Sequence, residues 1–334
     1  MTIRIIAEAA QGYEGNFNLT EMLVKAAASS KADAIKYQLV YADELCTPNY
    51  EYYPLFKSLE LKESEWIKIK KLSDELKIDL QFDIFGSKSL RLCEKLNIKT
   101  IKLHPTDMTN QELLGKVAKS KILNVYLGIG GSELDEINSA INQLKNKNII
   151  LMTGFQNYPT PIKSNQISRI SYLKNKLTAK NIEFGFADHE VSQSIEKFLI
   201  PAIAVGSGVK YIEKHFTISK SLNLEDSETA LSPEEFRIFT SALKLSSLSI
   251  GRTRNTNNFG MSKEEKNYRN TIRRHVVSKS KIKKGKIIHS KDLSLKRSAE
   301  KKPIKDLNMV IGKKAKREIQ ANQPITLGDL VFND

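Results

Sequence analysis

Short apolar or β-branched runs recur eight times in the first 220 residues, separated by longer segments that mix apolar and charged positions. The longer segments have helical spacing, as in Met22, Leu23, Ala26 and Ala27. Most of the runs are about five to eight residues long, which is the usual length of a buried strand. The pattern therefore predicts eight strands, at residues 3–10, 34–40, 79–85, 100–105, 125–130, 149–154, 183–188 and 211–216.

Each predicted strand is followed by a helical segment, and the last of these has a clear start. Ser232-Pro233-Glu234-Glu235 combines an N-cap serine, a proline at the first helical position and a capping-box glutamate. Eight such units over about 240 residues are typical of a (β/α)8 TIM barrel, although an open doubly wound sheet alternates in the same way. No G-x-G-x-x-G follows the first strand, which removes the dinucleotide-binding form of the open sheet. We therefore predict an α/β fold with a catalytic barrel at residues 1–250.

The composition and the hydrophobic pattern of the chain change after this predicted barrel. Residues 251–270 are polar, rich in Asn and Arg, and lack a hydrophobic period, so they are interpreted as a linker. Short strand-like runs and turn signals then indicate a small domain at residues 271–334. About 65 residues bury little core on their own, so this domain is expected to dock on the barrel or on a second chain.

The formal charge of +15 is concentrated at the C-terminal end of the chain. Residues 251–334 contain 22 Lys and Arg against 8 Asp and Glu, which leaves a net charge of +1 for the first 250 residues. Such a surface is explained by solvation or by attraction of small anionic substrates. Nucleic-acid binding is the weaker interpretation, because no stacking aromatic residues are interleaved with the basic ones.

The remaining composition indicates a cytoplasmic protein. No apolar run approaches the roughly 18 residues that a membrane span needs, and the first residues lack a signal-peptide core. Cys46 and Cys93 are the only cysteines, and they lie far apart in dissimilar segments. They therefore offer neither a disulfide framework nor a thiolate metal cluster.

Polar side chains collect where the predicted strands end, which is where a barrel carries its functional groups. Charged groups facing a barrel core are costly to bury unless they are paired or ligate something. The alternative is that single members point outward, because a register shift of one residue reverses a side chain. The residues concerned are Glu8, Lys36, Gln38, Asp83, Lys102, His104, Asp107, Gln156, Asn157, Tyr158, Asp188, His189, Glu213, Lys214 and His215.

Two of the five histidines, His189 and His215, fall at equivalent positions of adjacent predicted strands. Neutral imidazole is the commonest metal ligand, and two such groups on neighbouring strands can share one cation. A third ligand would come from Glu8, Asp188, Glu213 or water. A hydrogen-bonded histidine pair without a metal is the alternative at this stage.

Several segments resemble the N-acetylneuraminate (sialic acid) synthase family, and the likeness covers nearly the whole chain. In addition, KSKIKKGKIIHSKDLSLKR at 279–297 is similar to the antifreeze-like (SAF) domain that ends these synthases. The segments of the barrel that carry the likeness are IAEAAQGYEGN at 6–16, ADAIKYQLVYADEL at 32–45, IKLHPTDMTNQELL at 101–114, NYPTP at 157–161, FGFADHE at 184–190, YIEKHFTISK at 211–220 and EDSETALSPEEF at 225–236.

The resemblance implies an enzyme that condenses phosphoenolpyruvate with an open-chain amino sugar aldehyde and releases phosphate. It implies a divalent cation, Mn2+ or Mg2+, acting as a Lewis acid. It also implies a domain-swapped homodimer in which the C-terminal domain of one chain covers the barrel mouth of the other.

The resemblance further assigns roles to single residues. His189 and His215 become metal ligands, and Glu8 lies near the metal and its water. Lys36 and Lys102 fall where the family holds the carboxylate and phosphate of the donor. Substrate-binding positions are implied for Gln38, Asp83, Asp107, Gln156, Tyr158, Asp188 and Asp226, and for Arg297, which would reach the site of the partner chain.

The sequence also departs from the motifs of this family. Small hydroxyl or amide donors that the family aims at the donor substrate are replaced, and one replacement adds a negative charge. The departures are Asp83, Pro105, Gly128, Gln156 and Ala187. These departures therefore affect the expected binding of the anionic donor substrate more than the expected binding of the metal.

Three hypotheses follow. The first is a synthase that makes a 3-deoxy-2-ulosonic acid, which would feed a surface glycan. The second is a metal-dependent aldolase or lyase that uses pyruvate and no phosphate. The third is a non-catalytic protein whose basic C-terminal domain binds glycan or nucleic acid. Glu225-Asp226-Ser227 resembles the pseudaminic acid synthase branch, but the acceptor sugar stays open.

Overall fold

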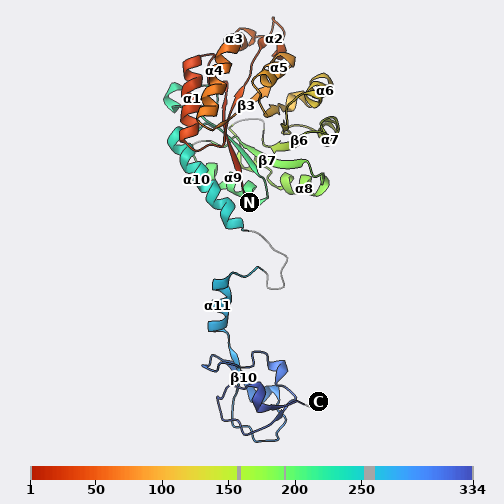
Figure 1. Cartoon of the computed structure of the whole chain (residues 1–334), viewed down its shortest axis with the longest axis vertical. Coiled ribbons are helices and arrows are strands. Elements are labelled where there is room, and N and C mark those ends of the chain that lie inside the picture. Colours follow the sequence, from red (N-terminus) through yellow and green to blue (C-terminus); the bar gives the residue numbers. More distant parts are fainter. Residues whose placement is uncertain (1, 156–158, 192, 252–259, 333–334) are drawn as a thin grey trace. The chain divides into compact units, whose positions relative to one another are not determined.

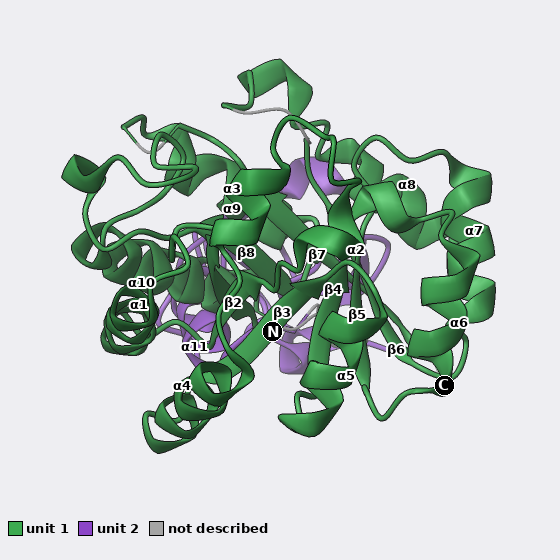
Figure 2. Ribbon diagram, turned by 90° about the horizontal axis from the view of Figure 1, so that it is seen from above, with its two compact units in different colours: residues 1–252 green, residues 253–334 purple. Residues whose placement is uncertain are grey.

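The computed structural model describes residues 2–155, 159–191, 193–251 and 260–332. The chain divides into two compact units, Met1–Arg252 and Thr253–Asp334, which are coloured separately in Figure 2. Within the described part of the chain, no helix is both long and apolar enough to cross a lipid bilayer.

Unit 1 is a closed barrel in which each strand pairs in parallel with the next and the eighth pairs with the first. The predicted TIM barrel is therefore confirmed, and the predicted strand ends lie within two residues of the observed ones. The strands are β1 (Arg4–Ala10), β2 (Ala34–Gln38), β3 (Asp79–Ile84), β4 (Thr100–Leu103), β5 (Asn124–Gly128), β6 (Asn148–Thr153), β7 (Ile182–Asp188) and β8 (Tyr211–His215).

Helices surround these strands, as Figures 1 and 2 show. The predicted start of the last helix is observed, since Glu235 N donates to Ser232 Oγ at 3.4 Å and Ser232 N donates to Glu235 at 3.0 Å. Two short helices, α2 (Ala42–Leu45) and α3 (Tyr53–Ser58), follow β2. The main helices are α1 (Phe17–Ser29), α4 (Glu63–Glu75), α5 (Ser87–Lys95), α6 (Gln111–Lys119), α7 (Leu134–Gln143), α8 (Ser168–Lys176), α9 (Glu196–Gly206) and α10 (Pro233–Ile250).

Apolar side chains fill both sides of the strands. Between strands and helices, Trp66 packs edge-on against Tyr13 and Phe82, with ring centroids 5.6 and 5.0 Å away. Inside the barrel, a separate buried cluster comprises Ile6, Ala34, Tyr126, Ile150, Met152 and Ala187. The barrel is therefore a packed core rather than a pore, and its polar groups gather at one end.

The strand register aligns the polar residues of neighbouring strands. Glu8 of β1 is paired with Lys36 of β2 and with His215 of β8. Asp83 of β3 is paired with Lys102 of β4. Because the carboxyl ends of parallel strands meet at the same mouth of a barrel, this register brings acids, lysines and a histidine together.

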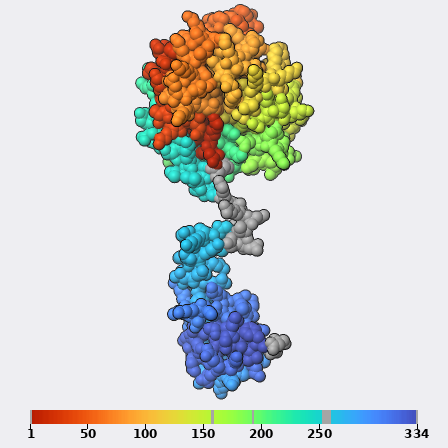
Figure 3. All heavy atoms as spheres, in the orientation of Figure 1, coloured from red at the N-terminus to blue at the C-terminus, as the bar shows by residue number. Residues whose placement is uncertain are grey.

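Unit 2 has its own core and is seen as a compact blue body in Figure 3. Its short strands β9 (His275–Ser278), β10 (Leu293–Lys296), β11 (Lys314–Ala315) and β12 (Leu330–Val331) form two antiparallel pairs. The core comprises Val276, Ile282, Ile288, Leu293, Ile304, Val310, Ala315, Ile319, Ile325 and Leu330.

One helix lies partly in the segment that the sequence indicates as a linker. Helix α11 (Lys263–Ile272) begins with a capping box, in which Ser262 N donates to Glu265 Oε2 at 2.7 Å. None of its residues is buried. The helix therefore lacks the hydrophobic period from which the barrel helices can be predicted, and the capping box is its remaining sequence signal.

Candidate active site

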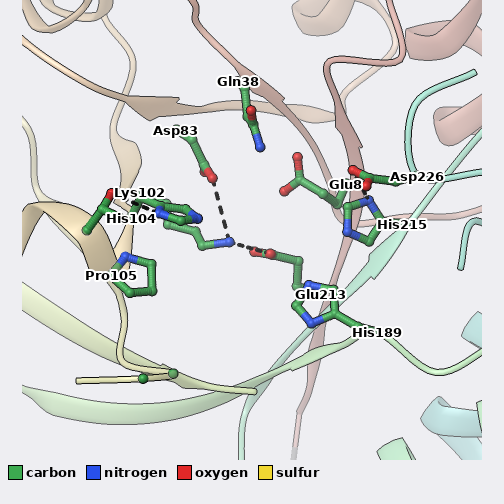
Figure 4. A pocket seen from close by; sticks show the side chains of 13 residues that line it. Glu8, Gln38, Asp83, Lys102, His104, Pro105, His189, Glu213, His215 and Asp226 are labelled. Atoms are coloured by element: carbon green, nitrogen blue, oxygen red, sulfur yellow. Dashed lines mark hydrogen bonds and ion pairs between the residues drawn. The ribbon is translucent and has the colours of Figure 1, made fainter. Parts of the chain in front are cut away.

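A cavity of about 530 Å3 opens at the carboxyl ends of the barrel strands (Figure 4). Its lining joins seven of the predicted site residues, five from different strands, one directly after β7 and one from a loop: Glu8, Gln38, Asp83, Lys102, His215, His189 and Asp226. The rest of the lining is His104, Pro105, Thr106, Gly130, Gly131 and Glu213. The strand-end position of these residues is where TIM-barrel enzymes carry their chemistry.

Two lysines and three carboxyl groups form a network at the base of this cavity. The Lys36 ammonium contacts Glu8 and lies 2.5 Å from Asp83 Oδ1 and 3.5 Å from Glu213 Oε2. Lys102 Nζ lies 2.5 Å from Glu213 Oε1 and 3.6 Å from Asp83 Oδ2. Lys36 is fully buried, whereas Lys102 lines the cavity. Both predicted lysines thus belong to the site, but each is already paired with carboxylates.

The network gives its acids different protonation states. Burial raises the pKa of Glu8 to about 8, and Asp83 and Glu213 add to this effect while Lys36 opposes it. Burial also disfavours ionised Glu213, but Lys102 and Lys36 outweigh it and hold the pKa of Glu213 at about 2. At neutral pH Glu8 is mostly protonated and Glu213 is ionised. A carboxyl group that titrates near neutral pH is suited to acid–base catalysis.

The two predicted metal ligands lie side by side, with ring centroids 5.3 Å apart. Burial lowers the pKa of His189 to about 4, and His215 contributes to the shift. Burial likewise lowers the pKa of His215 to about 3, despite the opposing charge of Glu213. Both imidazoles are therefore neutral at pH 7, which is the form that binds metals.

The tautomers of these histidines also suit a cation. His189 Nδ1 donates to the carbonyl of Phe155 at 2.7 Å, and His215 Nδ1 lies 3.4 Å from Asp226 Oδ2. An oxygen acceptor at Nδ1 leaves the lone pair of Nε2 for a ligand bond. No three His, Cys, Asp or Glu side chains of the described chain form a complete metal shell. The pair could therefore supply two ligands and leave the others to water or substrate, as catalytic sites do.

Acidification is expected to destabilise the metal-free protein through these two histidines. Their folded-state pKa values are depressed below 6.5, so the unfolded chain binds more protons and stability falls as the pH drops below this value. Between pH 7 and pH 5 the loss should be about 2 kcal/mol for each histidine. Urea unfolding of chelator-treated protein at both pH values measures it. The His189→Gln and His215→Gln variants should each lose their share of the pH dependence; an unchanged dependence would contradict the assignment.

Asp188 is predicted to bind substrate, but the structure places its side chain elsewhere. Its carboxylate is fully buried, lies 3.1 Å from Lys214 Nζ and accepts from Glu190 N at 2.9 Å. Lys214 also donates to the carbonyl of Glu190 at 2.6 Å. Successive residues of a strand face opposite sides, so Asp188 points away from the cavity that the next residue, His189, lines. Its contacts are those of a buried structural ion pair.

Replacing Asp188 with asparagine is expected to reduce stability rather than substrate affinity. The change removes the charge that compensates buried Lys214 and should lower the free energy of unfolding by about 3 kcal/mol. Urea unfolding and steady-state KM values measure the two effects. Asp74→Asn is a matched control, because its exposed pair with Lys70 should contribute less than about 1 kcal/mol. A raised KM with unchanged stability would restore Asp188 as a binding residue.

Asp107, Arg297, Gln156 and Tyr158 are the remaining predicted site residues. Asp107 ends the short turn after β4 and accepts from Asn110 Nδ2 at 2.9 Å. Arg297 belongs to unit 2, where its Nε donates to the carbonyl of Ile272 at 3.3 Å. Gln156 and Tyr158 lie outside the described residues.

The structure adds residues to the site that the sequence did not assign to substrate. The sequence indicates Glu213 only as a possible metal ligand, whereas in the structure its carboxylate lies between the two lysines. His104 and Thr106 line the cavity beside Lys102. A signal was available for His104 and Glu213, because each is two positions from another inward-facing strand residue, Lys102 and His215 respectively.

Comparisons with known proteins agree with this geometry. The NeuB family model matches residues 23–255, and the SAF domain model matches residues 273–331. An uncharacterized protein of Methanocaldococcus jannaschii is 31% identical over 330 residues, which cover 98% of this chain and 94% of that protein. The N,N'-diacetyllegionaminic acid synthase of Legionella pneumophila is 27% identical, covering 96% of this chain and 92% of the enzyme.

A solved structure supports the same relationship. The crystal structure of N-acetylneuraminic acid (sialic acid) synthetase from Leptospira borgpetersenii, in complex with citrate, has a TM-score of 0.73 and 28% sequence identity. It covers 82% of this chain and 93% of the synthetase. The resemblance to sialic acid synthases with an antifreeze-like domain is thus confirmed, and the chain belongs to the NeuB family and carries a C-terminal SAF domain.

Proposed function

We propose that this protein is a carbon–carbon bond-forming synthase that condenses phosphoenolpyruvate with an amino sugar aldehyde to give a 3-deoxy-2-ulosonic acid and phosphate. Membership of the NeuB family supports the reaction, as do relatives named as legionaminic, pseudaminic and N-acetylneuraminate-9-phosphate synthases. The observation that carries the proposal is one cavity lined by two neutral histidines, a lysine and a carboxyl group with a pKa near 8.

The reaction balances without a redox partner. C3 of phosphoenolpyruvate forms a bond to the aldehyde carbon, whose oxygen takes up a proton. A water molecule adds to C2, and phosphate leaves as the C2 ketone forms. The chain therefore has to hold two substrates, exclude bulk water and move protons at two oxygen atoms.

The residues of the cavity divide these tasks. Lys102 places a positive charge beside the anionic donor. Glu8 in its ionised form accepts a proton from the water that adds to C2 and can return it as an acid. Gln38 and Asp226 line the cavity as hydrogen-bonding groups for sugar hydroxyls. Glu213 holds Lys102 in place through their 2.5 Å ion pair.

A divalent cation completes this proposal. Mn2+ or Mg2+ held by His189 and His215 would supply Lewis-acid polarisation of the aldehyde. Asp226 and the Phe155 carbonyl orient the two imidazole rings through their Nδ1 atoms. The neutral charge of both rings and the Phe155 hydrogen bond that fixes the tautomer of His189 are the support for this assignment.

The proposal includes a cytoplasmic enzyme that acts as a domain-swapped homodimer. Its support is the resemblance stated from the sequence, in which Arg297 of the SAF domain serves the site of the partner chain. Sedimentation equilibrium and complementation between His215→Ala and Arg297→Ala chains test it. Mixed dimers should recover activity, because one of their two sites then has both residues intact.

The other sequence hypotheses lack support among the relatives reported above. These relatives do not favour a pyruvate-using aldolase or lyase, or a non-catalytic protein that binds glycan or nucleic acid. Phosphate release distinguishes all three. Phosphoenolpyruvate, Mn2+ and a panel of 2-acetamido aldoses are mixed with the enzyme, and phosphate is expected only when sugar, metal and enzyme are all present. The absence of phosphate with every sugar would overturn the synthase proposal.

A further inference from the structure

The Lys36 ammonium is surrounded by carboxyl groups. Its Nζ donates a hydrogen bond to Asp83 Oδ1 at 2.5 Å, contacts Glu8 and lies 3.5 Å from Glu213 Oε2. The side chain of Lys36 is also fully buried and is not part of the cavity lining. An anion in the cavity therefore meets Asp83 before it meets Lys36.

Lys102 differs from Lys36 because its side chain lines the cavity. Its Nζ lies within hydrogen-bonding distance of one carboxylate, Glu213, and 3.6 Å from another, Asp83. At least one of its three N–H groups therefore remains for a ligand. Lys102 is the only lysine or arginine in the cavity lining as the structure describes it.

A pair of residues beside Lys102, at the same strand end, supplies one further donor. His104 Nδ1 and Thr106 Oγ1 are 3.0 Å apart, and both residues line the cavity. Figure 4 labels His104 there. If Thr106 donates to Nδ1, the Nε2–H of His104 remains to donate. If Nδ1–H donates instead, the hydroxyl hydrogen of Thr106 remains. In either tautomer the pair offers one hydrogen-bond donor to an anion.

Pro105 and Gly128 determine the backbone conformation beside His104 and Thr106. A side chain at position 128 would approach Pro105 Cδ to 2.8 Å, so the proline ring occupies that space and residue 128 has to be glycine. The proline also holds the preceding His104 in the extended conformation, at φ −70° and ψ 152°. These two departures from the family motifs therefore belong to one structural change that presents His104 and Thr106 to the cavity.

We propose that the phosphate of the donor binds to Lys102, His104 and Thr106, and that Asp83 is a specificity-determining residue that withholds Lys36 from it. This inference rests on the proposed function for the identity of the donor. Asp83 acts as an internal anion between the two lysines, so the binding site for the donor phosphate lies on the β4 side of the mouth. This position of the phosphate depends on the acid at residue 83, because an uncharged residue there would leave a Lys36 N–H free.

Calorimetric titration of the Mn2+-loaded full chain with phosphoenolpyruvate and with pyruvate tests this subsite. His104→Ala and Thr106→Val should each weaken phosphoenolpyruvate binding about tenfold, because one charge-assisted hydrogen bond is lost. Pyruvate has no phosphate, and its affinity should stay within about twofold. Equal weakening of both ligands would show that the carboxylate binds here, and unchanged affinities would show that neither does; both outcomes overturn the proposal.

Asp83 is tested by Asp83→Asn, with Asp83→Ser as a second variant in case the first does not fold. Each should bind phosphoenolpyruvate about tenfold more tightly, because a Lys36 N–H and its charge become available. Asp79→Asn is the matched control, since Asp79 begins the same strand and pairs with Arg4. Unchanged or weaker binding in the position 83 variants overturns the role of Asp83. These titrations do not depend on turnover, so a correct subsite with no phosphate release would contradict the proposed function alone.

Discussion

Replacement of His189 or His215 by alanine is expected to abolish turnover, with kcat/KM falling by at least about 10³-fold. Each change removes one of two neutral imidazoles that face each other at 5.3 Å, and a divalent cation bound by a single side chain loses most of its affinity. Calorimetry with Mn2+ should show at least about a 100-fold weaker Kd for each variant. Both variants should remain folded, because neither ring carries an ionic charge at pH 7.

The control for these variants is His289→Ala, which alters an exposed histidine of unit 2. It should bind Mn2+ and turn over like the natural protein. Undiminished Mn2+ affinity in both barrel variants would show that the histidines form a metal-free pair. Retained metal affinity with lost turnover would assign them to substrate instead.

Replacement of Glu8 by glutamine is expected to lower kcat by about 10³-fold while KM values change little. Glutamine resembles the protonated carboxyl group that Glu8 presents at neutral pH, so the packing around Lys36 is kept and only proton transfer is lost. In the natural enzyme the base must be ionised, and its raised pKa means that the rate should climb with pH up to about 8. The rate of the variant should lack this rise.

Glu183→Gln is the control variant. Glu183 lies near the N-terminal end of β7, away from the cavity at the carboxyl ends of the strands, and pairs with exposed Lys210. Its kcat and its pH profile should match those of the natural enzyme. A Glu8→Gln variant with near-normal kcat would remove Glu8 from the chemistry, and a rise with pH that persists in it would assign the titration to another group.

The fold could be predicted because the signal is repeated. Eight apolar runs of strand length, each followed by a segment with helical spacing, leave few architectures, and the closed barrel is one of them. Helix α11 was missed for the opposite reason. It buries no side chain, so no hydrophobic stripe distinguishes it from a polar linker.

The location of the site could be predicted, whereas the pairing within it could not. His189 and His215 follow from strand ends alone, because all parallel strands of a barrel end at one mouth. Asp188 could have been excluded by alternation, since it directly precedes His189. That Asp83 and Glu213 lie beside the Lys36 ammonium depends on side-chain distances across three strands, and no local pattern encodes these.

The structure shows which contacts replace the lost family residues at three of the positions that depart from the family motifs. The sequence showed lost hydroxyl donors at 105 and 128 and a gained charge at 83. The structure shows a proline ring packed where a side chain at 128 would lie and a carboxylate held between two lysines. The changes at positions 83, 105 and 128 therefore rearrange the Lys102 side of the cavity, while His189 and His215 remain in its lining.

Mass spectrometry of the product tests the central claim most directly. The purified enzyme is incubated with Mn2+, phosphoenolpyruvate and a 2-acetamido aldose from the panel that gives phosphate release. The predicted product has the mass of the sugar plus phosphoenolpyruvate and water, less one phosphoric acid, and it forms in equal amount to the phosphate released. Recovery of unchanged sugar, or formation of the same acid from pyruvate without phosphate release, would contradict the claim.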